Sequence, residues 1–173
     1  MHTPRAIASL LALALAGPAL GSLVEASSVE DLARRSDTVV RGKVERIVYD
    51  RSADGKRIFT YAEVVPSGVW RGAAPARLTV AVSGGVVGGI GQRVIGAPTF
   101  TQGEEVVLFL SRSKWGDYRV RGLGQGKFSV VAGQARPHLE GLSLSRRSAL
   151  RAGERGAEPM AVEELERRVR AAR

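Results

Sequence analysis

Short segments rich in β-branched residues, most of them with alternating polar residues, dominate the middle of the chain. They are TVVRGKVERIVYD, RIFTYAEVV, RLTVAV, EEVVLFL, DYRVRGL and GKFSVV, and together they span residues 38 to 131. A period of two indicates strands with one buried face, and turn residues such as Asp54-Gly55 indicate hairpins. Five or six strands at such short intervals predict a mainly β, antiparallel barrel or sandwich.

The core of this β-structure is expected where the aromatic residues lie, because two Trp, three Tyr and four Phe all fall between Tyr49 and Phe128. Gly42 lies inside the first strand, where glycine commonly marks a bulge or a bend at a barrel corner. From the alternation we predict that the interior holds the side chains of Val40, Val44, Leu78, Val80, Val107, Phe109 and Phe128.

The first 21 residues have the pattern of a signal peptide. Arg5 precedes an apolar run from residue 6 to residue 16, and Gly17-Pro18 then breaks the helix. Cleavage is predicted before Ser22, with cleavage before Ser27 as the alternative. The run is shorter than the roughly twenty residues that span a bilayer, so we expect an exported, periplasmic or extracellular protein without a transmembrane span in the mature chain. A retained membrane anchor is the competing interpretation.

A short helix is predicted at each end of the mature chain. Ser27 or Ser28, followed by acidic residues, can cap an N-terminal helix. Pro159 and a stripe of Met160, Leu165 and Val169 predict a C-terminal helix that docks on the barrel, with an amphipathic membrane or partner helix as the alternative. The predicted divisions are a signal peptide at 1–21, a barrel domain at 22–131, and an extension at 132–173 in which residues 132–158 form a loop.

Ionisable residues are spread along the chain rather than concentrated. The formal net charge is +9, falls to +8 when Arg5 leaves with the signal peptide, and includes no run of five or six like charges. A solubilising surface is therefore favoured over a nucleic-acid footprint, so no nucleic acid is expected as a partner. The chain has no cysteine, and an exported protein of this kind must fold without disulfides.

The sequence has few residues suited to catalysis or to binding a cofactor. The two histidines are His2, which lies in the signal peptide, and His138, which has no nucleophile or orienting acid near it in sequence. None of the three Gly-Lys pairs is followed by Ser or Thr, as a phosphate-binding loop requires. Glu104-Glu105 is an acidic pair without calcium-loop spacing. We predict a non-catalytic protein with no metal and no cofactor.

The order of four segments resembles the netrin-like module of tissue inhibitors of metalloproteinases, and still more closely small exported bacterial proteins of unassigned function. The segments are SVEDLARRSDTVVRGKVERIVYD, YAEVVPSGVWRG, GEEVVLFL and YRVRGLGQGKFSV, covering roughly residues 28 to 131. The resemblance implies a barrel of the oligonucleotide/oligosaccharide-binding (OB) type. In the eukaryotic inhibitors an amino-terminal cysteine binds the protease zinc. Ser22 or Ser27 would stand first here, so no inhibitory residue carries over.

Three classes of function remain open: a protein-binding module of the cell envelope, with protease modulation among its candidate activities; a binder of polyanions or glycans; and an enzyme of unrecognised type. Six glycines between Gly84 and Pro98 predict a long adaptable loop, which either meets a partner or plugs the barrel end. Partner-binding candidates on it are Val86, Val87, Ile90, Gln92, Arg93, Val94 and Ile95. Polyanion-binding candidates are Arg93, Arg119, Arg121 and Lys127, beside Trp115 and Tyr118.

Overall fold

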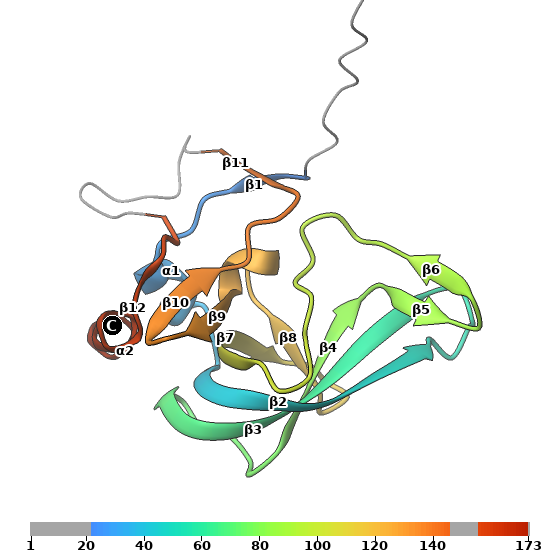
Figure 1. Ribbon diagram of the computed structural model, residues 1–173, viewed down its shortest axis with the longest axis horizontal. Coiled ribbons are helices and arrows are strands. Elements are labelled where there is room, and N and C mark those ends of the chain that lie inside the picture. Colours follow the sequence, from blue (N-terminus) through green and yellow to red (C-terminus); the bar gives the residue numbers. More distant parts are fainter. Residues whose placement is uncertain (1–21, 146–155, 173) are drawn as a thin grey trace, which may run out of the picture.

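The structure, a computed structural model, describes residues 22–145 and 156–172 (Figure 1). The predicted signal peptide lies outside the described residues. In chain order the elements are β1 (Ser22–Glu25), α1 (Val29–Arg34), β2 (Thr38–Arg51), β3 (Ile58–Arg71), β4 (Leu78–Ser83), β5 (Gly85–Val87), β6 (Ile90–Gln92), β7 (Glu105–Arg112), β8 (Tyr118–Val120), a 3-10 helix η1 (Leu123–Gly126), β9 (Lys127–Val131), β10 (Gln134–Pro137), β11 (Leu142–Ser145), β12 (Met160–Ala161) and α2 (Val162–Ala171).

Five strands close into a barrel, which confirms the predicted mainly β, OB-like fold class. The strand order is β7-β2-β3-β4-β8, and β8 pairs with β7 to complete the circle. Neighbouring strands are antiparallel except β4 and β8, which are parallel where Val80 meets Tyr118. Because β7 and β8 pair with each other, the five-stranded sheet closes on itself, and neither of these two strands forms an open sheet edge.

The long β2–β3 hairpin forms the largest part of the barrel wall. The predicted strand over residues 57–65 is longer in the structure, because β3 continues through Pro66 to Arg71. Pro66 lies opposite Gly42, where the register shifts, and a Cβ on Gly42 would lie 2.6 Å from the carbonyl oxygen of Val65. The bend predicted at Gly42 is therefore present, and it lets a proline sit inside a strand.

The sheet continues beyond the barrel through β9, which matches the predicted strand GKFSVV, and then through β10 and β12, although residues 132–158 are predicted to form a loop. That prediction is wrong for β10 and β11. Ala132 and Gly133 both have positive φ, at 50° and 74°, and form a two-residue turn that returns the chain onto β9. Alanine rarely adopts positive φ, so this turn has no strong signal at the level of residue types.

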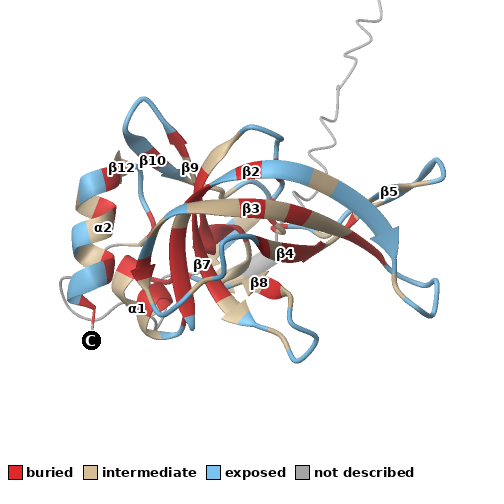
Figure 2. Ribbon diagram, turned by 90° about the horizontal axis from the view of Figure 1, so that it is seen from below, coloured by how far each residue is buried: buried red, intermediate tan, exposed pale blue. Residues whose placement is uncertain are grey.

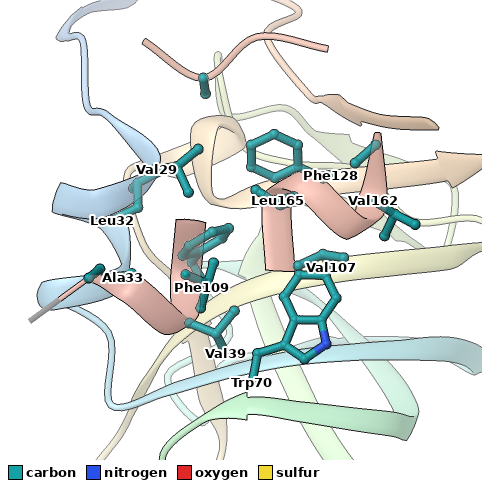
Figure 3. Packing of buried hydrophobic residues seen from close by; sticks show 14 of the residues in the cluster. Val29, Leu32, Ala33, Val39, Trp70, Val107, Phe109, Phe128, Val162 and Leu165 are labelled. Atoms are coloured by element: carbon teal, nitrogen blue, oxygen red, sulfur yellow. The ribbon is translucent and has the colours of Figure 1, made fainter. Parts of the chain in front are cut away.

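Two hydrophobic cores lie on opposite faces of the same strands. The barrel interior contains Val40, Val44, Leu78 and Val80, as predicted. The other predicted interior residues, Val107, Phe109 and Phe128, are fully buried but on the outer face, beneath α1 and α2 (Figure 3). The prediction that these three residues are buried is confirmed, but the prediction that they face the barrel interior is wrong. Residues Val106 to Leu110 are buried on both sides of the sheet, so alternation cannot tell which face is which (Figure 2).

The two helices cover this outer face together. Ser28 caps α1, as predicted, because its Oγ accepts a hydrogen bond from the backbone N–H of Asp31 at 3.1 Å. In α2, Val162, Leu165 and Val169 are buried in the outer core, which confirms a docked terminal helix. Arg168 donates from Nε and Nη2 to the two carboxylate oxygens of Glu30 on α1, at 2.6 and 2.8 Å. The C-terminal segment is thus part of the folded unit.

Candidate binding surface

The glycine-rich segment from residue 84 to residue 100 divides into two parts of different character. Its first part forms the hairpin β5–β6, which lies over the far end of the β2–β3 hairpin (Figure 1). Gly88 and Gly89 connect the strands with φ of 59° and 78°, a conformation that favours glycine. The segment predicted as one adaptable loop is therefore partly regular structure.

The base of the β5–β6 hairpin is fixed to its neighbours by polar contacts. The side-chain oxygen of Gln92 accepts a hydrogen bond from the backbone N–H of Ile58 at 2.7 Å, and the hydroxyl of Thr60 donates to the carbonyl of Gly84 at 2.8 Å. A Cβ on Gly85 would lie 2.7 Å from the Tyr49 ring, so only glycine allows this close approach. These contacts hold the hairpin in one position relative to the barrel.

The apolar side chains of this hairpin face solvent to an unusual degree. Val86 is 59% exposed and Ile90 is 57% exposed, and Tyr49 beside them is 48% exposed. Val87, Gln92 and Val94 are half-buried, whereas Arg93 and Ile95 are exposed. No charged residue lies between Arg77 and Arg93. The seven partner-binding candidates thus lie together on one projecting arm whose one charged residue is Arg93, at its base.

The second part of the segment closes the barrel end. Phe100 is buried against the interior core, Gly96 and Pro98 are buried, and Ala97 packs on the same cluster. Residues 96–100 therefore plug the barrel end, whereas residues 85–95 form an arm of which Val86 and Ile90 are exposed.

A groove with a volume of about 240 Å³ runs between the arm and this plug. Its lining is mainly apolar and includes Tyr49, Val82, Val94, Pro98 and Phe100. Its rim carries Arg93 and Glu140, whose side chains form an exposed ion pair at 3.2 Å. Exposed pairs of this kind contribute little stability, so a binding partner can exchange with either member at small cost.

His138 also lines the groove. Burial lowers the pKa of its imidazole below the ordinary value of 6.5, and the nearby positive charge of Lys127 lowers this pKa further. The imidazole is therefore neutral at pH 7 and offers one donor and one acceptor to a ligand. His138 and Glu140 were not recognised as binding residues, because they follow β10 in a segment that we read as a loop.

Lys127 is the one polyanion-binding candidate that the structure removes from the surface. Its side chain is 3% exposed, and its ammonium group donates to Glu104 at 2.7 Å and lies 5.1 Å from the centre of the Phe100 ring. Burial lowers the pKa of Lys127, while the hydrogen bond to Glu104 raises it. Lys127 anchors the loop after the plug and is not available to a polyanion.

The other three polyanion-binding candidates do not form one surface with Lys127. Arg93 is at the base of the arm, Arg119 is on β8, and Arg121 is exposed just after β8. Trp115 is exposed in the β7–β8 turn, whereas Tyr118 is buried. Arg93 and Arg121 are thus exposed and Arg119 is half-buried, and the sequence could not show which of these arginines share a face.

The described residues contain no group of three or more His, Cys, Asp or Glu side chains placed to hold a metal ion. Within the same residues, no helix combines the length and the apolar character needed to cross a bilayer.

Comparison with the models of protein families found no match, and comparison with curated proteins found no significant similarity.

Proposed function

We propose that this protein is a non-catalytic binding module, and that its contact surface for a protein partner consists of the β5–β6 arm and the adjacent groove. The observation that carries the proposal is the exposure of Val86 and Ile90 on a hairpin whose base is fixed by hydrogen bonds. Apolar side chains held in a rigid, exposed position gain free energy when a partner covers them. Export to the cell envelope, inferred from residues 1–21, belongs to the same proposal.

The shape and charge of this surface fit a protein partner. The arm supplies protruding aliphatic side chains, and the groove beside it can receive an apolar side chain from the partner. The chain as a whole carries a net charge of +9, yet this surface has one cation, Arg93, and one anion, Glu140. Interface centres are typically poor in charge and rimmed by polar groups, which is the arrangement found here.

Modulation of a protease is the narrower activity that we propose within this function, and it depends on the netrin-like resemblance. The arm would make the contact, because the chain has no cysteine with which to imitate the amino terminus of the eukaryotic inhibitors. Titration of the purified protein against proteases of the same envelope tests this narrower proposal separately from binding.

The double substitution Val86→Ser and Ile90→Ser tests the binding surface. The wild-type protein, the double variant and Val131→Ser are each immobilised and exposed to the solubilised envelope of the producing cell. Val131 is the matched control, because it is 64% exposed but lies on β9, outside the arm and the groove. We expect one protein to be captured by wild type and by the control, with affinity for the double variant reduced roughly tenfold or more.

Thermal unfolding of the same three proteins decides between a binding surface and a structural one. Substitution of exposed residues changes stability by about 0.5 kcal/mol or less, so the melting temperature should hold in all three. Equal capture by the double variant and wild type would refute the proposed surface. A melting temperature lowered by several degrees in the double variant alone would show that the arm stabilises the barrel instead.

A further inference from the structure

A second surface, on the outer face of β3, β4 and β8, combines aromatic and basic side chains. Ala62 and Val64 on β3 point into the barrel, so Phe59 and Tyr61, which alternate with them, point outward. Arg119 points outward for the same reason, because its neighbours Tyr118 and Val120 pack on the interior core. None of Arg57, Phe59 and Tyr61 was singled out from the sequence.

Two guanidinium groups cover the ring of Phe59. The guanidinium carbons of Arg57 and Arg119 lie 5.6 and 5.1 Å from its centre, and the ring of Tyr61 lies 6.2 Å away. This cover explains why Phe59 is 9% exposed although it faces outward. A guanidinium that stacks on a ring still has its N–H groups in its own plane, where they can bind a carboxylate.

Arg57 and Arg119 differ in how far their guanidinium groups are already engaged by other residues. Arg119 forms an ion pair with Asp117 at 2.9 Å and donates to the carbonyl of Ala81 at 3.5 Å. Arg57 forms no ion pair within 4.0 Å among the described residues, although Asp54 interacts with it electrostatically at longer range. Its backbone is nevertheless fixed, because Arg57 and Ser52 exchange hydrogen bonds across the turn at 2.8 and 3.0 Å.

We propose that this surface, which we call the Arg57–Tyr61 face, binds a glycan that contains an acidic sugar. The guanidinium of Arg57, which forms no close ion pair, donates hydrogen bonds to both oxygens of one sugar carboxylate. The half-exposed ring of Tyr61 supports the apolar face of a neighbouring sugar. The Arg119–Asp117 pair provides a donor and an acceptor for sugar hydroxyl groups. This proposal is independent of the β5–β6 arm.

The local charges favour a uronic acid over a nucleic acid. Asp50 lies directly opposite Phe59 on β2, Asp54 in the β2–β3 turn interacts electrostatically with Arg57, and Asp117 already neutralises Arg119. A strand with a phosphate at every nucleotide would bring negative charges close to these carboxylates, where like charges repel. A glycan in which the acidic groups are separated by hydroxyl-rich sugars can place one carboxylate on Arg57 and keep its other acidic groups away from the three aspartates.

The test measures binding of an oligouronate of about six sugars by calorimetry, with a neutral oligosaccharide and a single-stranded oligonucleotide of similar length as further probes. We expect the oligouronate to bind and Arg57→Gln to weaken it roughly tenfold or more, since a charge-assisted bidentate contact is lost. Arg57→Lys should also weaken binding, because it keeps the charge but not the planar fork. Tyr61→Leu should weaken binding through lost stacking.

Arg136→Gln is the matched control, because Arg136 is an exposed arginine on β10 and its loss changes the net charge by the same amount. Equal weakening in Arg57→Gln and Arg136→Gln would show attraction by net charge alone and would overturn the proposal. So would absence of oligouronate binding, or tighter binding of the oligonucleotide. Val86→Ser with Ile90→Ser should leave oligouronate binding unchanged, so failure of the arm as a partner surface is distinguished from failure of this site.

Discussion

Substitution of Phe109 by alanine is expected to destabilise the protein by about 3 to 5 kcal/mol. Phe109 is fully buried, and its ring lies 5.8 Å from that of Phe128 in the outer core. The substitution removes this ring from beneath α1 and α2, which both contribute to the same cluster. The Arg168–Glu30 ion pair joins the two helices over this core, and we expect their shift to fill the space only in part.

Urea unfolding measures this effect directly. With a slope of about 2 kcal/mol/M, a loss of about 4 kcal/mol lowers the unfolding midpoint by about 2 M. Val131→Ala is the control, because Val131 is 64% exposed and its substitution should change the free energy of unfolding by about 0.5 kcal/mol or less. An unchanged midpoint in Phe109→Ala would refute the assignment of Phe109 to the packed face beneath the helices.

Two further predictions concern the titratable residues His138 and Lys127, which are wholly or partly buried. The pKa of His138 in the folded protein lies below 6.5, so the unfolded chain takes up a proton first and the free energy of unfolding falls as pH decreases through 6.5. In His138→Asn this part of the pH dependence should disappear from unfolding curves measured across that range. Lys127→Met should cost about 3 kcal/mol in urea unfolding, because the carboxylate of Glu104 loses its ion-pair partner and keeps only hydrogen bonds from Ser129 and Thr101, and adding Glu104→Leu should restore most of the loss.

The barrel strands could be predicted from the sequence because their signals are local. Alternation along residues 38–51 and the Asp54-Gly55 turn identify the first hairpin without knowledge of the rest of the fold. Signals failed where the backbone departs from the usual preference of a residue type. Ala132 adopts positive φ in the turn before β10, and Pro66 continues a strand because Gly42 bends the partner strand opposite it.

The candidate surfaces were predicted only where they are continuous in sequence. Val86, Ile90 and Arg93 could be grouped because they belong to one glycine-rich segment. His138 reaches the groove from a turn more than forty residues later, and Arg119 reaches Phe59 through the parallel pairing of β4 and β8. Such contacts depend on how the barrel closes. Alternation predicts that the strands form a barrel or sandwich, but it does not predict which residues become neighbours on closure.

Residues 84–100 divide into an exposed arm and a plug, because only part of this segment is needed to close the end of the barrel. The interior core must be closed, and Phe100 with its neighbours Ala97 and Pro98 does this within five residues. Val86 and Ile90 are therefore not needed to exclude water from the core, and their exposure carries a cost in solubility that the fold does not require. An exposed aliphatic hairpin held by Gln92 and Thr60 is consequently better explained by a partner outside the chain than by the stability of the barrel.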